Sequence, residues 1–372
     1  MKVGIITYDL SIMRGGTRLA IMLGQELQRA GFEVAFSAVY EDLKSLENKF
    51  GETYNFEVFK PKRPFLAKKI ANISSHWNLN PSVKKMCLEF KPDIVIEIGG
   101  VIAPLKVPIK LKIPTIHYVL FPASCYSSIN IYKVGLLNRV YSRFCRHIEL
   151  SIIHKVNKII SMCSFTKRLV RDVWGIDTES IFPPVNTDLI VPLKKRNLIL
   201  SVLVFNEIHR IEEMIDNFIS LNKTNYELVI TGQKDNEEYF NKLVNKYKNN
   251  TSIKIHSEIP FDDLKRYYGE SKIFWYPVWT HYGFIMAEAQ SAGCIVIAPG
   301  GDRGAGDIII NNESGFVVEK FEEIFDKTKG IIDNDKLMNK MSKKARENAV
   351  ERLSIYTFRE KFVKAIKETI KN

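Results

Sequence analysis

Cysteine is scarce in this chain of 372 residues, and its distribution argues against two classes of site. The five cysteines are Cys87, Cys125, Cys145, Cys163 and Cys294. They are scattered through apolar stretches without C-x-x-C spacing, so neither a disulfide framework nor a zinc site is indicated. We expect all five thiols to be reduced.

Long apolar runs are also missing. No window approaches the roughly 18 consecutive apolar residues that indicate a membrane span. The N-terminus enters a strand pattern at Val3 and offers no small-residue cleavage site of the kind that ends a signal peptide. The composition, with 45% hydrophobic and 26% charged residues, is typical of a globular protein. We therefore expect the chain to stay in the cytoplasm.

Several catalytic motifs are absent. No G-x-G-x-x-G follows the first predicted strand, which argues against a dinucleotide oxidoreductase. No G-x-x-x-x-G-K-[ST] is present, which excludes a P-loop enzyme. Neither H-E-x-x-H nor a cluster of carboxylates with histidine indicates a metal site.

Positive charge is abundant and unevenly placed. The net charge is +12, with 26 Lys+Arg against 16 Asp+Glu in residues 1–190 and 28 against 26 in residues 191–372. Much of the excess lies in residues 60–69, 84–85 and 106–112, mixed with apolar and aromatic residues. This mixture suits an anionic membrane surface, at about 1 kcal/mol per basic residue close to the surface. The alternatives are a nucleic-acid surface, for which we find no motif, and a solvated lysine-rich face without a partner.

Strand-like runs alternate with helix-period runs through both halves of the chain. This alternation predicts an α/β architecture of parallel sheets covered by helices on both faces, and the length predicts two domains of roughly 150 to 200 residues. Because consecutive prolines interrupt regular structure in residues 181–188, we place the boundary there. We expect domains at 1–187 and 188–353 and a C-terminal helix at 354–372 that crosses back to the first domain.

The predicted elements are as follows. In the first half we expect strands at 3–7, 34–39, 93–96, 115–118 and 158–161, and helices at 15–30, 136–153 and 165–174. In the second half we expect strands at 198–205, 227–231, 252–256, 272–276, 295–298 and 315–318, and helices at about 207–221, 236–249, 261–270 and 283–292.

Residues 280–293 are the most informative stretch, because they connect two predicted strands through a glycine-containing loop and a helix. Backbone N–H groups at the N-terminus of that helix favour a phosphate. Glu288, about one turn further, could accept hydrogen bonds from a ribose diol. Taken alone, an ordinary core helix explains the same pattern equally well.

In open α/β sheets, ligands bind beyond the carboxyl ends of the strands. We expect the loop with Gly15 and Gly16, His117 and residues 280–288 to face a cleft between the two sheets. Without a Cβ atom, Gly15 and Gly16 allow close approach of a phosphate or an acceptor, although a plain helix-start turn has the same sequence. A lone histidine after a strand is more often a structural residue.

Together these features resemble the retaining glycosyltransferase family 4. The resemblance covers essentially the whole chain and rests on Gly15 and Gly16, residues 183–186, residues 200–202, and residues 280–293 followed by residues 300–303. The sequences at residues 281–284 and 115–118 are most similar to those of the branch that extends polyprenyl-linked oligosaccharides with mannose.

The resemblance implies a GT-B fold, in which two Rossmann-like, doubly wound domains face a nucleotide-sugar cleft. It implies metal-independent transfer of a hexose, mannose or glucose, from a GDP- or UDP-linked donor to a glycan acceptor with retention of configuration. No cofactor is needed. The first domain is expected to bind the acceptor and the second domain to bind the donor. The basic surface of the first domain suggests that the acceptor is lipid-linked, at the cytoplasmic face of a membrane.

The resemblance also implies roles for individual residues. Glu288 matches the second of two glutamates separated by seven residues and is expected to hold the ribose, and His117 matches a histidine near the transferred sugar. The implied catalytic residues are His117 and Gly16, and the implied donor-binding residues are Gly15, His209, Arg210, Thr280, His281, Tyr282, Gly283, Phe284 and Glu288. No metal ligand is implied.

The sequence departs from the family pattern at three positions. Thr280 replaces the first glutamate, which leaves the donor sugar open. Val204 and His209 stand where the family presents an arginine and a lysine to the diphosphate. The candidate replacements are Arg210, Arg18 and Arg303, although Arg210 could also be a solvated helix-start residue.

These losses keep a second function open, a nucleotide-sugar-binding partner subunit with little or no transfer activity. A hydrolase or epimerase on the same fold would need an acidic pair or a base that we do not identify.

Overall fold

The structure is a computed structural model that describes residues 1–12, 14–50, 53–61, 71–100, 102–122, 125, 136–300 and 303–371. The chain divides into two compact units. The first unit comprises Met1–Pro183 and Phe358–Asn372, and the second comprises Pro184–Thr357. The division lies in the proline-containing segment at which the sequence places the domain boundary.

The first unit is built on a parallel sheet with the strand order β5-β3-β1-β6-β7-β8-β9. Its strands are β1 (Lys2–Ile6), β3 (Glu33–Ser37), β5 (Glu57–Phe59), β6 (Ile94–Gly99), β7 (Thr115–Val119), β8 (Lys158–Ser161) and β9 (Glu179–Ser180), and a separate short pair is formed by β2 (Asp9–Leu10) and β4 (Tyr40–Glu41). Its helices are α1 (Gly15–Arg29), α2 (Leu43–Phe50), α3 (Ala71–Glu89), η2 (Ala103–Leu105), α4 (Lys106–Lys110), α6 (Leu136–Ile153), α7 (Ser164–Trp174) and, from Phe358 onward, α15 (Ile355–Lys371).

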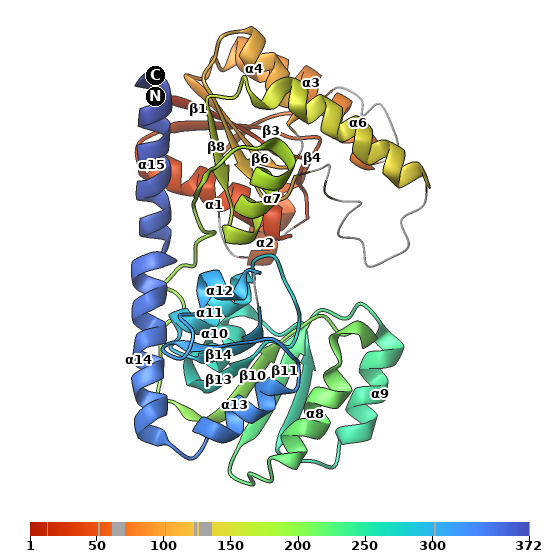
Figure 1. Ribbon diagram of the computed structural model, residues 1–372, viewed down its shortest axis with the longest axis vertical. Helices are drawn as coiled ribbons and strands as arrows, with labels where there is room; N and C mark the ends of the chain where they lie inside the picture. The colour runs from red at the N-terminus through yellow and green to blue at the C-terminus, as the bar shows by residue number, and fades with distance from the viewer. Residues whose placement is uncertain are drawn as a thin grey trace. The chain divides into compact units, whose positions relative to one another are not determined.

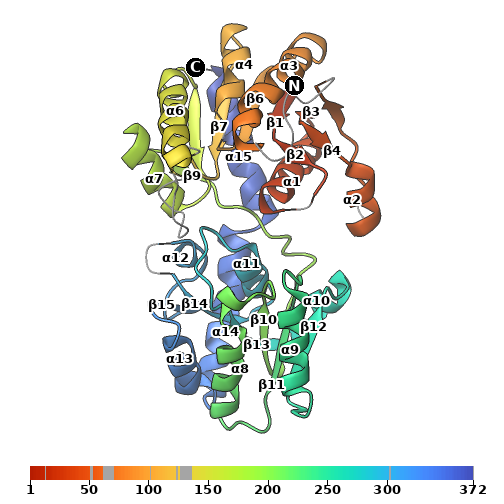
Figure 2. The same ribbon diagram turned by 90° about the vertical axis from the view of Figure 1, so that its right-hand side faces the viewer.

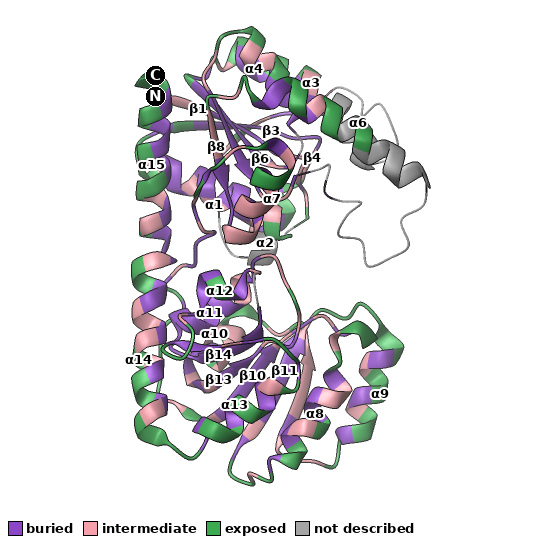
Figure 3. Cartoon of the chain, in the orientation of Figure 1, coloured by how far each residue is buried: buried purple, intermediate pink, exposed green. Residues whose placement is uncertain are grey.

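Helices cover both faces of this sheet (Figure 1, Figure 2). One face packs against α3, α6 and α7 in a core that includes Met86, Ile152 and Trp174. The other face packs against α1 and α15, where Phe362 meets the ring of Tyr118 with ring centroids 5.0 Å apart. Because both faces are covered, the strands read as nearly continuous apolar runs, and these runs are buried in Figure 3.

The second unit repeats the plan with the strand order β12-β11-β10-β13-β14-β15, all neighbours parallel. Its strands are β10 (Arg196–Val202), β11 (Glu227–Gly232), β12 (Ile253–Ser257), β13 (Ser271–Trp275), β14 (Ile295–Pro299) and β15 (Gly315–Val318). Its helices are η4 (Glu207–His209), α8 (Ile211–Ser220), α9 (Glu237–Tyr247), α10 (Phe261–Glu270), α11 (Phe284–Ser291), α12 (Ala305–Ile308), α13 (Glu323–Ile331) and α14 (Asp335–Arg352).

The two faces of the second sheet have different covers. Helices α8, α9 and α13 pack on one face around Phe218, Leu243 and Phe325. Helices α10, α11 and α14 lie on the other face (Figure 1). The N-terminus of α14 is capped by Asn334, whose side-chain oxygen accepts a hydrogen bond from the N–H of Leu337, as expected for a helix start.

The main elements follow the sequence prediction, with one correction that bears on the site. The predicted helix at 207–221 is interrupted, because Arg210 adopts a left-handed backbone (φ 51°) between η4 and α8. The predicted strand at 198–205 also ends early, at Val202. Helices α2, α3, α4, α12, α13 and α14 have no counterpart among the predicted elements.

Two further expectations concern membranes and thiols. Within the described ranges, no helix is long and apolar enough to cross a membrane. Cys87, Cys125, Cys163 and Cys294 are buried free thiols, whereas the side chain of Cys145 lies outside the description. Of the basic segment at residues 60–69, residues 62–69 also lie outside the described residues.

Candidate functional site

In the second unit, α11 begins immediately after the loop of residues 280–283. Its N-cap is Gly283, which has no side chain to cap the helix, so the first N–H groups of α11 are presented beyond its end. A Cβ atom at Gly283 would lie 2.6 Å from the terminal methyl group of Met286, so a larger residue there would require this flexible side chain to move. The helix predicted at about 283–292 is present as α11, Phe284–Ser291, in the segment that follows β13.

Glu288 lies one turn into α11 and is only 3% exposed. The hydroxyl of Tyr268 donates a hydrogen bond of 3.1 Å to Oε2 of Glu288. A buried carboxylate costs free energy unless hydrogen bonds stabilise its charge, and this bond contributes to that stabilisation. The Glu288 side chain is therefore fixed by a hydrogen bond, near the start of the helix where the sequence predicts that a ribose binds.

The loop before α11 is organised by its own polar groups. The hydroxyl of Thr280 donates to the carbonyl of Tyr282 at 3.2 Å, and the ring of Tyr282 packs edge-on against Phe284. In place of the carboxylate that the family pattern has there, Thr280 supplies a hydroxyl that braces the turn. A direct contact of Thr280 with a sugar stays a prediction.

A second loop packs closely on this one. A Cβ atom at Gly304 would lie 2.1 Å from the carbonyl oxygen of His281, so only glycine allows the two backbones to approach. The guanidinium of the neighbouring Arg303 lies 5.7 Å from the ring centroid of Trp279. Burial, with the positive charge of Arg303 adding to it, lowers the pKa of His281 below its ordinary value. Arg303 thus brings a cation next to the loop that starts α11.

The two other candidate donor residues follow β10. Nδ1 of His209 lies 2.6 Å from the carbonyl oxygen of Val204 and therefore donates to it, so Nε2 is the acceptor of the neutral ring. Arg210 makes two bonds of 2.8 and 2.6 Å to Glu213 and one of 2.9 Å to Glu322. These bonds raise the pKa of Arg210 and hold its side chain at the start of α8. This arrangement matches the alternative of a helix-start residue.

In the first unit, His117 lies on β7 and is 0% exposed. Its Nδ1 atom is 2.5 Å from Oε2 of Glu97, the residue directly across on β6, in a contact that lacks the alignment of a linear hydrogen bond. Its ring also lies 5.8 Å from that of Trp174, whose Nε1 donates to the buried Glu149. The ring has no exposed surface from which to contact a sugar, so the predicted catalytic role stays a prediction that requires the ring to become accessible.

Gly15 and Gly16 form the first turn of α1, which covers the opposite face of the sheet. A Cβ atom at Gly16 would lie 3.4 Å from the side chain of Leu120, just beyond the carboxyl end of β7. The structure thus brings the glycines to the predicted end of the sheet but separates them from the ring of His117. Arg18, in the same helix turn, bonds through its N–H to the carbonyl of Arg14.

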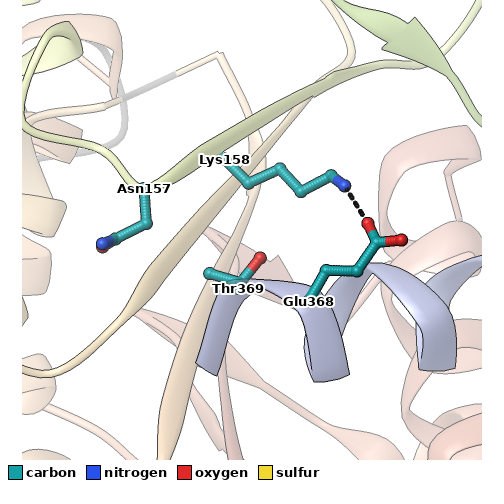
Figure 4. Close-up of a pocket in the computed structure, with 4 residues that line it drawn as sticks. All are labelled: Asn157, Lys158, Glu368 and Thr369. Carbon is teal, nitrogen blue, oxygen red and sulfur yellow. Dashed lines mark hydrogen bonds and ion pairs between the residues drawn. The ribbon is translucent and has the colours of Figure 1, made fainter. Parts of the chain in front are cut away.

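A small pocket of about 180 Å³ lies elsewhere in the first unit, lined by Asn157, Lys158, Glu368 and Thr369. Figure 4 shows the ion pair between Lys158 and Glu368, 2.7 Å long, beside it. The pocket lies at the start of β8, away from the carboxyl ends of the strands, so it is not the predicted ligand site. In the part of the chain that the structure describes, no group of three or more His, Cys, Asp or Glu residues could hold a metal ion.

Sequence reasoning missed Tyr268 and Lys195. Tyr268 reaches Glu288 from α10, and Lys195 binds carbonyl groups at the ends of α10 and α11. No motif marks either residue. The only available signal is the apolar face of the predicted helix at 261–270, on which Tyr268 lies.

The comparisons with known proteins agree with this arrangement. The family model described as Glycosyltransferase Family 4 matches residues 13–189, and the model described as Glycosyl transferases group 1 matches residues 190–348. A solved glycosyltransferase from Rickettsia africae is 18% identical with a TM-score of 0.77, covering 100% of this chain and 99% of that one. The fold is GT-B, and the chain belongs to the glycosyltransferases that these two family models describe.

Two curated relatives are more specific. This chain is similar to GDP-Man:Man(3)GlcNAc(2)-PP-Dol alpha-1,2-mannosyltransferases of Dictyostelium discoideum, at 22% identity over 68% of this chain, and of Homo sapiens, at 24% identity over 69%. The matches span 58% and 60% of those two proteins, so the chain covers less than two thirds of their length.

Proposed function

We propose that this glycosyltransferase moves a hexose, mannose in the first instance, from a nucleoside-diphosphate sugar to a lipid-linked glycan, without a metal and with retention of configuration. The observation that carries the proposal is the position of Glu288, a buried carboxylate one turn beyond the uncapped start of α11. The similarity to the two GDP-Man:Man(3)GlcNAc(2)-PP-Dol alpha-1,2-mannosyltransferases supports a GDP-linked mannose donor and a polyprenyl-type acceptor.

Charge on the leaving group is the main electrostatic demand of such a reaction. As the glycosidic bond breaks, negative charge builds on the nucleoside diphosphate, and fixed donors and cations that stabilise it accelerate transfer. In the second unit the start of α11 supplies oriented N–H groups, and Arg303 supplies a cation beside the same loop. Arg303 is proposed to do part of the work of the missing family arginine and lysine.

A basic surface of the first unit supports the proposed membrane contact. Leu88 at the end of α3 and Leu111 just after α4 are 53% and 44% exposed, and exposed lysines lie near them in the sequence. The two helices precede β6 and β7, which are neighbours, so the helix ends lie at the same edge of the sheet. Exposed leucine among lysines suits an anionic lipid surface. We propose that this face meets the cytoplasmic side of a membrane that carries the acceptor.

The test is donor turnover by the full chain. GDP-mannose, UDP-glucose and a panel of other GDP-, UDP- and ADP-sugars are incubated with membrane extract, and release of the nucleoside diphosphate is followed with and without EDTA. We expect release with one donor, unchanged by EDTA and reduced by at least about 100-fold in Glu288→Ala, the size seen when an oriented active-site group is removed. Glu313→Ala, the same change at an exposed position of the second unit, is the matched control.

The opposite outcome has a defined meaning. If no donor releases its nucleotide while GDP or UDP raises the unfolding temperature, the chain is a nucleotide-sugar-binding partner subunit. That alternative is favoured by the loss of the usual cations at Val204 and His209. Release that EDTA abolishes would contradict the proposed independence from metal.

A further inference from the structure

The side chain of Tyr268 has an unusual position for a polar group, because it is 0% exposed and points from α10 to α11. Its ring packs against Phe274 with centroids 5.8 Å apart. Burying a hydroxyl costs free energy unless it is hydrogen-bonded, and phenylalanine would fill nearly the same space. The hydroxyl lies 3.1 Å from Oε2 of Glu288. A carboxylate only accepts hydrogen bonds, so the tyrosine donates.

The helix that carries Tyr268 is itself fixed relative to α11. Nζ of Lys195 donates to the carbonyl oxygens of Ser271 at 2.7 Å and Ala292 at 2.6 Å. Ser271 is the C-cap of α10, and Ala292 is the C-cap of α11. One ammonium group therefore joins the ends of the two helices whose side chains meet at Glu288.

The backbone of Tyr268 belongs to the same cluster. Its carbonyl oxygen accepts a hydrogen bond from Sγ of Cys294 at 3.1 Å and a longer one from Nζ of Lys195 at 3.5 Å. Gly269, the next residue, allows the side chain of Leu193 to pack against α10, since a Cβ atom at position 269 would lie 2.6 Å from that side chain. These contacts leave the Tyr268 hydroxyl little freedom to move away from Glu288.

From this geometry we infer that Tyr268 is a positioning residue that holds the carboxylate of Glu288 for the ribose diol of a nucleoside diphosphate, with Lys195 fixing α10 against α11. An ionised carboxylate has about four lone-pair sites, so a bond to one oxygen leaves capacity for ligand hydroxyl groups. The inference rests on the proposed function, because it needs a nucleotide at Glu288.

The experiment compares a ribonucleotide with an analogue that lacks the diol. Calorimetry gives the dissociation constants of GDP and 2′,3′-dideoxy-GDP for the full chain, or of the corresponding uridine pair if turnover identifies a UDP-sugar donor. The wild type should prefer the ribonucleotide. Tyr268→Phe should weaken GDP binding by about tenfold, the loss expected for one hydrogen bond to a charged group, and leave dideoxy-GDP binding within about twofold.

The matched control is Tyr226→Phe, which removes another buried tyrosine hydroxyl of the second unit that bonds the carbonyl of Ile332 at 3.4 Å. It should leave both dissociation constants unchanged. Should Tyr268→Phe not fold by thermal unfolding, Tyr268→Met removes the same hydroxyl with a flexible apolar side chain. The double variant Tyr268→Phe, Glu288→Gln should lose no more GDP affinity than Glu288→Gln alone.

The outcomes separate this inference from the proposed function. Equal losses for both nucleotides, or no loss for GDP, overturn the positioning role of Tyr268 even where turnover establishes the transferase. A wild type that binds the ribonucleotide selectively but transfers no sugar overturns the transferase proposal, while the nucleotide preference of Tyr268→Phe still decides the positioning role. A wild type that binds neither nucleotide overturns both.

Discussion

Glu97 in the first unit and Glu288 in the second are buried to the same degree, each 3% exposed, but they have different partners. Glu97 contacts the ring of His117 inside a core that also holds Trp174. Glu288 accepts a hydrogen bond from the hydroxyl of Tyr268, one turn into helix α11. Of these two carboxylates, Glu288 lies within about a turn of a helix start, where backbone N–H groups favour an anionic ligand, whereas Glu97 lies on a strand of the first sheet. A buried carboxylate near such a helix start is therefore a candidate ligand group.

The largest expected effect follows from breaking the contact between His117 and Glu97 in the first unit. His117→Ala removes a fully buried ring beside Glu97 and should destabilise the protein by about 3 kcal/mol, as the loss of one partner of a buried pair does. Because Glu288 lies in the other unit, nucleotide affinity should be unchanged. Denaturant unfolding and GDP calorimetry measure the two quantities.

The assignment of His117 as a core residue is wrong if His117→Ala unfolds at the same denaturant concentration as the wild type but has lost sugar transfer. That result would show that the ring becomes accessible and acts on the transferred sugar, as the family resemblance implies. His154→Ala, at an exposed histidine of the same unit, is the control.

The second prediction sharpens the account of the second unit by comparing two arginines. Arg303→Gln should lower the transfer rate by about 100-fold if it stabilises the leaving diphosphate. Arg210→Gln should change the rate by less than about threefold, since its guanidinium is engaged with Glu213 and Glu322 in exposed pairs that contribute little. Initial rates at saturating donor measure both, and a larger loss in Arg210→Gln would reverse the assignment.

How far the sequence could predict this molecule depended on how local each feature is. The two-domain α/β architecture and the loop and helix at 280–291 were predictable, because strands, glycine turns and helices follow one another directly in the chain. The GT-B fold was implied by the family resemblance. The burial of His117 was not, because it depends on Trp174 and Glu149, which come from helices α7 and α6. Tyr268 and Lys195 could not be assigned to Glu288 for the same reason, since their contacts span 20 and 97 residues of sequence.

The basic surface of the first unit gives a smaller effect. Replacing Lys84, Lys106 and Lys110 together with glutamine should weaken binding to vesicles of phosphatidylcholine with phosphatidylserine, at about 1 kcal/mol for each lysine that lies close to the lipid. Co-sedimentation at two salt concentrations measures it. The control replaces Lys329, Lys340 and Lys343, which are exposed in the second unit. Equal losses in both variants would mean that net charge, and not this surface, attracts the vesicles.

The smallest expected effect concerns His281, which lies in the loop before α11 of the second unit. It is a change in how stability depends on pH. Burial and Arg303 lower the pKa of His281, so the folded protein takes up this proton less readily than the unfolded chain. Stability from the neutral ring is therefore complete above the unfolded value of about 6.5 and is lost as the pH falls below it towards the folded value. His281→Asn should remove this dependence, so that the drop in melting temperature between pH 7.5 and pH 5.5 is smaller than in the wild type by roughly 1 to 3 °C. An unchanged drop would show that the acid sensitivity of the protein does not arise from His281.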